Sequence, residues 1–252
     1  MMFDDAELER YQRHIVLKEV GGEGQRRFRA ASVVVVGAGG LGNPCLQYLA
    51  AAGVGRIRII DDDVVSLSNL QRQTLFSTAD IGRPKVEAAA ERLLALNPHV
   101  VIEPVQARLS AEGAGALLGG CDVIADGCDN FRTRSEVNRA AVALGLPLVS
   151  AALGPFEGQL GVFAGHLPDQ PCYACFAGLP QDVPGTSCAD IGVLGAVAGL
   201  MGAAQALEVL RLIAGFGDSR IGQLWLYEGL SMESRSIRVR KDHACPVCAE
   251  GA

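Results

Sequence analysis

The sequence lacks an excess of positive charge, a basic leader and a long hydrophobic run. Its formal net charge is −6 at pH 7, so we expect no duplex nucleic acid and no anionic membrane among its partners. The opening MMFDDAELER is acidic, whereas a signal peptide begins with basic residues and continues into an apolar segment. The longest uncharged apolar run, residues 191–204, is too short and too rich in glycine for a membrane span and predicts a buried helix. Together these features predict a cytoplasmic protein.

The eight cysteines stand in a chain without an export signal, which favours free thiols or metal ligands over disulfide bonds. Two pairs, Cys172 with Cys175 and Cys245 with Cys248, have the C-x-x-C spacing of zinc knuckles. Four thiolates make a closed tetrahedral site that leaves no position for water, so we predict a structural Zn²⁺. Free thiols, a redox-active C-x-x-C and a mixed site that includes His243 are the alternatives.

Strand-like and helix-like segments alternate through much of the chain. SVVVVG (32–37) is apolar on both faces, as in a central parallel strand. RIRIID, VVIEPV, CDVIAD and PLVSAA are further strand candidates, and helices are expected near residues 42–52, 84–97 and 131–144, the last capped by Asn130. After residue 152, EGQLGVFAG, QLWLYEG and SRSIRVR have the pattern of strands without crossover helices. We therefore predict an α/β fold, doubly wound and Rossmann-like, whose mostly parallel sheet is extended by antiparallel C-terminal strands.

A glycine-rich loop, GAGGLG (37–42), follows the first predicted strand and precedes a predicted helix. Glycines allow the backbone to approach a phosphate, and the helix N-terminus offers N–H groups to it. Asp61 ends the next strand, where a carboxylate accepts hydrogen bonds from ribose hydroxyls. This context predicts a nucleotide site rather than a merely structural turn, but it leaves open whether the nucleotide is NAD or ATP.

Polar residues farther along the chain favour a triphosphate. ATP carries about three to four negative charges, which cations must neutralise before a phosphorus atom accepts a nucleophile. Arg72 follows the acidic strand end, Lys85 begins a predicted helix, and Asp129 follows a buried strand and would suit Mg²⁺. Each residue has an ordinary alternative: a surface ion pair for Arg72, a solvated helix start for Lys85, and a helix-capping acid for Asp129.

Several motifs together resemble the MoeB/ThiF family of carrier-protein adenylyltransferases, which are relatives of the ubiquitin-activating enzymes. They are GAGGLG, DDDVVSLSNLQRQTLF, GRPKVEAA, CDN, CYAC and CPVC, and the resemblance extends from RYQRHI (10–15) to the last cysteine pair. It implies an enzyme that binds ATP and Mg²⁺ and activates the C-terminal glycine of a small ubiquitin-like protein. The carboxylate of that glycine would attack the α-phosphate, which gives an acyl-adenylate and pyrophosphate.

The resemblance also implies roles for individual residues. Gly40 would contact the nucleotide and Asp61 the ribose, whereas Lys85 would neutralise developing charge. Asp129 would hold Mg²⁺ beside Asn130. The phosphate region would be lined by Ser68, Asn69 and Arg72.

The implied assembly is an obligate homodimer, because Arg13 matches an arginine that reaches into the neighbouring subunit's site. We expect a single adenylyltransferase domain over residues 1–252, with a nucleotide-binding half (1–150) and a half for carrier binding and zinc (151–252). The expected partner is a ubiquitin-like sulfur-carrier protein ending in Gly-Gly, of molybdopterin or thiamine biosynthesis. A separate sulfurtransferase or cysteine desulfurase would supply the sulfur.

Cys188 lies in GTSCADIG, just ahead of a predicted helix whose N-terminus would lower the pKa of its thiol. In ThiF-like members a cysteine at this place forms a disulfide-linked intermediate with the carrier, whereas MoeB-like members do not require one; a plain loop thiol is the alternative. Two other functions remain possible on the sequence alone, an NAD-dependent oxidoreductase and a non-catalytic, zinc-stabilised scaffold that binds carriers. The oxidoreductase gives no role to Arg72, Lys85 and the two cysteine pairs, and the scaffold is disfavoured because every expected nucleotide-site residue is present.

Overall fold

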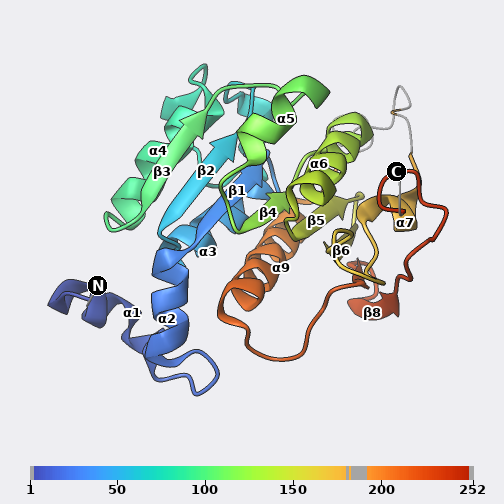
Figure 1. Ribbon diagram of the computed structural model, residues 1–252. Helices are drawn as coiled ribbons and strands as arrows, with labels where there is room; N and C mark the ends of the chain where they lie inside the picture. Colours follow the sequence, from blue (N-terminus) through green and yellow to red (C-terminus); the bar gives the residue numbers. More distant parts are fainter. Residues whose placement is uncertain (1–2, 180–181, 183–191, 250–252) are drawn as a thin grey trace.

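The computed structural model describes residues 3–179, 182 and 192–249, which form one twisted sheet flanked by helices (Figure 1). The sheet has 8 strands in the order β3-β2-β1-β4-β5-β6-β7-β8. The strands are β1 (Ser32–Val36), β2 (Arg56–Ile60), β3 (Val101–Val105), β4 (Val123–Asp126), β5 (Leu148–Leu153), β6 (Glu157–Phe163), β7 (Gln223–Glu228) and β8 (Glu233–Arg238). The helices are α1 (Asp5–Ile15), α2 (Gly21–Ala30), α3 (Gly42–Ala52), α4 (Lys85–Leu96), α5 (Ala111–Leu118), α6 (Phe131–Leu144), α7 (Tyr173–Ala177) and α9 (Gly195–Ala214), with 3-10 turns η1 (Leu67–Asn69) and η2 (Thr78–Asp80).

The strands are parallel from β3 to β5 and antiparallel from β5 to β8. This confirms the predicted Rossmann-like sheet with antiparallel C-terminal strands. Strand order reverses between β1 and β4, since β2 and β3 lie on one side of β1 and the later strands lie on the other. The connections that follow β1 and β4 therefore leave in opposite directions and open a crevice at the carboxyl edge of the sheet, the usual ligand position in such folds.

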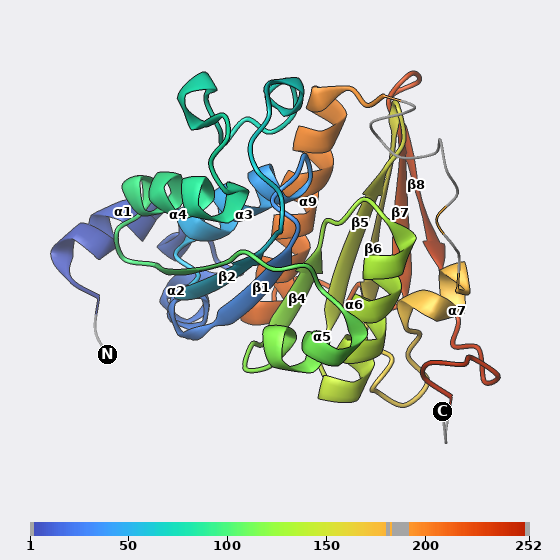
Figure 2. The same ribbon diagram turned by 90° about the horizontal axis from the view of Figure 1, so that it is seen from above.

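Helices cover both faces of the parallel strands. Figure 2 shows α3, α4 and α9 on one face and α5 and α6 on the other. Val33 and Val35 of β1 belong to the core under α3 and α9, whereas Val34 and Val36 belong to the core under α5 and α6. Burial on both faces explains why the β1 sequence is a continuous apolar run rather than an alternating one.

Helix α9 confirms the predicted buried helix and is longer than the apolar run that indicated it. Among the described helices it is the one that passes the length and hydropathy test for a membrane span. It packs against α3, β5 and β6, and its Met201 and Ala206 are fully buried. Gly202 allows α9 to lie directly on the Leu41 carbonyl, where any side chain would collide. These contacts are those of a core helix in the fold.

Candidate active site

A cavity of about 590 Å³ lies at the carboxyl edge of the sheet, where the connections that follow β1 and β4 diverge. Its walls come from segments that are far apart in the sequence. They include Gly39, Gly40, Asp61, Asn69, Arg72, Gln73, Lys85, Arg108, Asp129, Asn130, Arg134 and Gln159. The fold therefore brings together most of the site residues that the sequence predicted.

The glycine loop has the close approach that its sequence predicted. Gly37 adopts φ +92°, and a side chain there would press against the Gly127 backbone. Gly42 begins α3 and lies so close to the Gly37 carbonyl that a Cβ would overlap it. A Cβ on Gly40 would lie 3.4 Å from Arg72 Cδ, so the Arg72 side chain crosses directly over this loop. The N-terminal N–H groups of α3 and one guanidinium thus face the same region, which suits an anion.

Asp61 closes the β2 side of the cavity. Its Oδ2 accepts a hydrogen bond from the Ala38 N–H at 2.7 Å, and its Oδ1 accepts one from the Asp63 N–H at 2.8 Å. Burial raises the pKa of Asp61, and the positive charge of Lys85 and these N–H groups act against the increase. The carboxylate is therefore fixed to the glycine loop, and each oxygen keeps a further lone pair for a ligand hydroxyl.

Lys85 is a buried cation at the first position of α4. Its side chain is 5% exposed, and its Nζ donates a hydrogen bond to Asp63 Oδ2 at 2.7 Å. The alternative of a solvated helix start is therefore wrong. A buried ammonium group requires a charged partner, and Asp63, which also lines the cavity, supplies it.

Arg72 and Asn69 line the cavity, whereas their neighbour Ser68 does not. The Arg72 Nη1 donates to the Ser68 carbonyl at 3.2 Å, and the guanidinium forms no ion pair with any residue that the structure describes. The surface ion-pair alternative is thus not supported. Asn69 faces the cavity, whereas Ser68 is exposed outside it and pairs its Oγ with Ser66 Oγ at 3.2 Å.

In the loop between β4 and α6, the adjacent residues Asp129 and Asn130 have different roles. Asn130 Oδ1 accepts from the Thr133 N–H at 2.8 Å and caps α6, as the sequence predicted. Asp129 is exposed at the cavity and is not the cap of α6, so its helix-capping alternative is wrong. The Asp182 carboxylate also lies at the start of α6, where its Oδ1 accepts a hydrogen bond from the Phe131 N–H at 2.6 Å. No pattern in the sequence predicted a carboxylate at that place.

Gln73 is a cavity residue that the sequence reasoning missed. It is 3% exposed, and its Oε1 has no hydrogen-bond partner among the described residues. Gln73 belongs to the SNLQRQ motif, which was recognised in the sequence. The motif alone does not say which of its amide side chains lines the cavity. Arg108, Arg134 and Gln159 also line the cavity without having been predicted.

Besides Ser68, one predicted site residue that the structure describes, Arg13, does not line this cavity. Arg13 is exposed on α1 and lies outside the cavity lining of its own chain. Cys188 lies outside the described residues. The role of each stays a prediction.

The C-x-x-C pairs meet on α7 and the C-terminal segment, which lie side by side in both views (Figures 1 and 2). The four sulfur atoms lie within 4.8 Å of one another. Cys172 Sγ lies 3.7 Å from Cys245 Sγ, and Cys175 Sγ lies 3.4 Å from Cys248 Sγ. Thiolates at about 2.3 Å from a tetrahedral zinc ion would be separated by nearly these distances. His243 is exposed and is not part of this group, which argues against a mixed site.

The fold and the cavity define a Rossmann-like α/β protein with a glycine-rich loop, an acidic strand end and buried cations at one crevice. The chain belongs to the ThiF family, whose model matches residues 11–247. It is 46% identical to the sulfur carrier protein adenylyltransferase of Thermus thermophilus, over 99% of this chain and 94% of that protein. It is 42% identical to the sulfur carrier protein ThiS adenylyltransferase of Escherichia coli, over 97% and 96% of the two chains. The solved structure of E. coli MccB with ATP shares the fold, with a TM-score of 0.82 over 95% of this chain and 74% of that chain at 22% identity.

Proposed function

We propose that this protein catalyses the ATP-dependent adenylylation of the C-terminal glycine of a small ubiquitin-like sulfur-carrier protein. The observation that carries the proposal is the convergence of Gly40, Asp61, Arg72, Lys85 and Asp129 on one cavity. The family and the names of its relatives support the same reaction. The acyl-adenylate product would serve later sulfur transfer in molybdopterin or thiamine biosynthesis.

The reaction needs positioning and charge stabilisation more than proton transfer. A carboxylate oxygen of the carrier's terminal glycine forms a bond to the α-phosphorus of ATP while the bond from that phosphorus to the β-phosphate oxygen breaks. Pyrophosphate leaves with the electron pair. The attacking carboxylate is already ionised at neutral pH, so no side chain has to act as a base. Catalysis follows from holding the two anions in line and neutralising the charge that develops.

Each wall of the cavity has a part in this proposal. The glycine loop and the start of α3 would receive the phosphates, and Asp61 would bind the ribose hydroxyls. Arg72 over Gly40 and Lys85 at the entrance would neutralise the triphosphate and the leaving pyrophosphate. Asn69, Ser68 and Asn130 would complete the phosphate region, for which Ser68 has to turn from its present outward position.

Magnesium would be held by Asp129, whose exposed carboxylate at the cavity offers the hard oxygen ligand that this ion prefers. When bound, the ion would supply positive charge that stabilises the negative charge of the reacting phosphates. Asp61, Asp62 and Asp63 also bring carboxylate oxygens within 4.8 Å of one another. Asp129 is favoured over them because Asp63 is already paired with Lys85, and Asp61 is bonded to the glycine loop.

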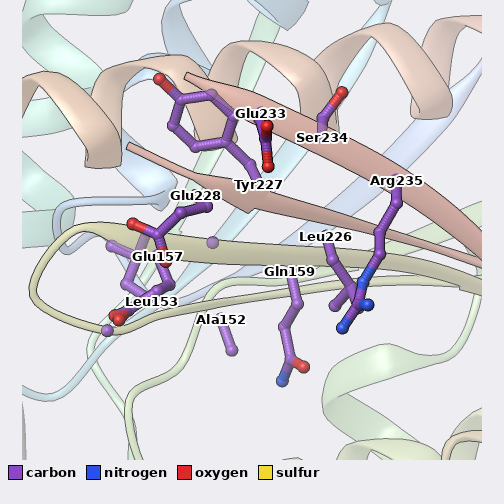
Figure 3. A pocket seen from close by; sticks show the side chains of 12 residues that line it. Ala152, Leu153, Glu157, Gln159, Leu226, Tyr227, Glu228, Glu233, Ser234 and Arg235 are labelled. Atoms are coloured by element: carbon purple, nitrogen blue, oxygen red, sulfur yellow. The ribbon is translucent and has the colours of Figure 1, made fainter. Parts of the chain in front are cut away.

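A second groove offers a path for the carrier's extended tail. It has a volume of about 500 Å³, lies on β6, β7 and β8, and shares Ala152, Leu153 and Gln159 with the nucleotide cavity. Figure 3 shows Gln159 and Arg235 on one side of these strands and Tyr227 on the other. We propose that the Gly-Gly tail lies along this groove, because the groove leads directly to the cavity. On this basis residues 1–150 supply the nucleotide half and residues 151–252 the carrier and zinc half of one domain.

The assembly and the metal complete the proposal. The active form would be a homodimer in which Arg13 reaches the neighbouring subunit's cavity, as its exposed position on α1 allows. Zn²⁺ would occupy the closed four-cysteine site in a structural role. A separate sulfurtransferase or cysteine desulfurase in the cytoplasm would displace AMP from the adenylate with sulfur. Cys188 either forms a covalent intermediate in that step or is a plain loop thiol.

Carrier-dependent exchange of radioactive pyrophosphate into ATP tests this function. Arg72→Ala and Asp129→Ala should each reduce the exchange rate at least about 100-fold. The matched control is Asp218→Ala, an exposed residue outside the cavity, which should retain wild-type exchange. Wild-type rates in both cavity variants would reject the residue assignment. Binding of NADH rather than ATP would favour an oxidoreductase, and ATP binding without carrier-dependent pyrophosphate release would favour a scaffold.

A further inference from the structure

Helix α6 carries three polar residues at four-residue spacing, Asn130, Arg134 and Asn138, which therefore lie along one face. Asn130 caps the end of the helix that borders the nucleotide cavity. Asn138, two turns away, reaches the cysteine cluster. Arg134 lies between them and is buried. The stripe thus spans the distance between the two functional parts of the molecule.

Arg134 holds the loop that carries Asp129. Its side chain is 5% exposed, and its Nη2 donates to the Cys128 carbonyl at 2.6 Å. Its Nη1 donates to Ser150 Oγ at 3.2 Å, and Ser150 Oγ in turn donates to Asp126 Oδ2 at 2.8 Å. The fully buried Asp126 balances the charge of the guanidinium. Cys128 directly precedes Asp129, so the guanidinium fixes the backbone from which the proposed magnesium ligand projects.

The other side of Arg134 rests on the cysteine cluster. Its Cζ lies 5.6 Å from the centre of the Tyr173 ring, a cation–π distance. Tyr173 stands between Cys172 and Cys175 in α7, and its N–H donates to Asn138 Oδ1 at 2.8 Å. Asn138 Nδ2 donates to Cys172 Sγ at 3.5 Å. The cysteine cluster, α6 and the Asp129 loop are therefore joined by consecutive contacts of buried groups.

We propose that Arg134 is a positioning residue of the nucleotide site, and that Tyr173 and Asn138 couple it to the cysteine cluster. The packing of the cluster then sets the position of Asp129. This inference rests on the proposed function only where it assigns Asp129 to the binding of MgATP. The start of the 126–130 loop is also held by the bond from the Gly127 N–H to the Val36 carbonyl at 2.9 Å, whereas the guanidinium holds the carbonyl next to Asp129, and the Tyr173 ring keeps the guanidinium in place.

The first test measures the loop directly and needs no nucleotide. Amide hydrogen exchange of residues 126–134 is compared in wild type, Tyr173→Leu, Tyr173→Phe and Arg139→Lys, with metal content measured for each. Tyr173→Leu removes the ring and should speed exchange of this loop about tenfold while the metal content stays at the wild-type value. Tyr173→Phe keeps the ring but loses the hydroxyl that bonds Arg134, so its exchange should lie between those of wild type and Tyr173→Leu, whereas Arg139→Lys, an exposed position on the same helix, should match wild type. If Tyr173→Leu does not fold, Arg134→Lys gives the same comparison.

The second test asks whether the effect passes through Asp129. In a double-mutant cycle on MgATP binding, Tyr173→Leu should raise the dissociation constant about tenfold in the wild-type background and little in the Asp129→Ala background. Equal effects in both backgrounds, or unchanged loop exchange, would overturn the coupling. If wild type binds MgATP but shows no carrier-dependent pyrophosphate exchange, the proposed function is rejected. The double-mutant cycle on MgATP binding still tests the coupling in that case. If wild type does not bind MgATP, loop exchange alone decides the coupling.

Discussion

Lys85 Nζ lies 2.7 Å from Asp63 Oδ2, and the two partners differ sharply in environment, since the lysine side chain is 5% exposed and the aspartate side chain 68%. The backbone reinforces the pair, because the Lys85 N–H donates to the Asp63 carbonyl at 3.0 Å. Asp63 therefore holds the buried cation at the cavity entrance and partly neutralises it. A bound triphosphate would compete with Asp63 for the same ammonium group.

Asp63→Asn should tighten ATP binding, because it removes the carboxylate that competes with phosphate for Lys85. We expect the dissociation constant of ATP to fall about three- to tenfold at low salt and the difference to shrink at high salt. The maximal exchange rate should fall, since Lys85 is less firmly positioned. Asp62→Asn is the matched control, because it removes the same charge from the same cavity without touching Lys85. Weaker ATP binding by Asp63→Asn would mean that Asp63 itself holds the nucleotide.

Asp80 should make the loop around η2 sensitive to acid. It is 1% exposed; burial alone would raise its pKa, but hydrogen bonds from the Ser77 N–H and hydroxyl and from Arg92 outweigh that and lower the pKa to about 2. A carboxyl group whose pKa is lower in the folded chain contributes stability above its unfolded pKa and loses it as pH falls through its folded pKa. The free energy of unfolding should therefore drop by about 2 kcal/mol between pH 4 and pH 2 from this group.

Asp80→Asn should remove this part of the pH dependence, with urea unfolding at each pH as the measurement. The variant is expected to be less stable at pH 7, because Arg83 and Arg92 lose their shared partner. Asp218→Asn, an exposed carboxyl group, should keep the wild-type pH profile. An unchanged slope in Asp80→Asn would show that other carboxyl groups cause the acid sensitivity.

The cysteine cluster should bind one zinc ion per chain. Cys245→Ser and Cys248→Ser should each abolish stoichiometric zinc in elemental analysis and lower the melting temperature, because the C-terminal segment is no longer tied to α7. Cys121→Ser is the control, since Cys121 is buried elsewhere and bonds the Leu118 carbonyl at 3.1 Å. Purified protein without metal that keeps its melting temperature in a chelator would contradict the site.

Local patterns in the sequence were sufficient for the parallel half of the fold. The apolar run 33–36, the glycine loop and the Asn130 cap each depend on neighbours within a few residues, and all were predicted correctly. Helix α2 was missed because Gly21, Gly22 and Gly24 disfavour a helix. It is stabilised from a distance instead, since the fully buried Gln25 donates its Nε2 to the Ala52 carbonyl at 2.8 Å.

In the candidate site, too, the residues that depend on local sequence were predicted, and those that depend on tertiary packing were not. Asp61 and Lys85 could be predicted because each stands at the end of a recognisable element. The Lys85 partner Asp63, the inward turn of Gln73 and the bond from Arg134 to the Cys128 carbonyl depend on tertiary packing, and a single sequence carries no direct signal for them. The short helix α7 was not among the predicted helices, and it packs against the cysteine cluster, whose other pair is far away in the sequence.

Gln73 should recognise the carrier tail rather than ATP. A buried amide oxygen without a donor costs about 1–3 kcal/mol, so a ligand N–H would relieve that cost. Triphosphate oxygens only accept hydrogen bonds, whereas the tail offers backbone N–H groups. Gln73→Leu should therefore raise the KM for carrier about tenfold, leave ATP binding unchanged and not lower the melting temperature. A selective loss of ATP affinity would instead assign Gln73 to the nucleotide.

The groove on the antiparallel strands should bind a positively charged face of the carrier. Glu157, Glu228 and Glu233 are register partners across β6, β7 and β8, so three carboxylates form one row. Like charges directly opposite each other destabilise a sheet, and a basic face on the carrier would relieve this repulsion. Glu233→Lys should therefore raise the KM for carrier about tenfold at low salt, less at high salt, with ATP binding unchanged. The same charge change at exposed Asp218 should have little effect, and a lower KM in Glu233→Lys would mean that the carrier presents an acidic face.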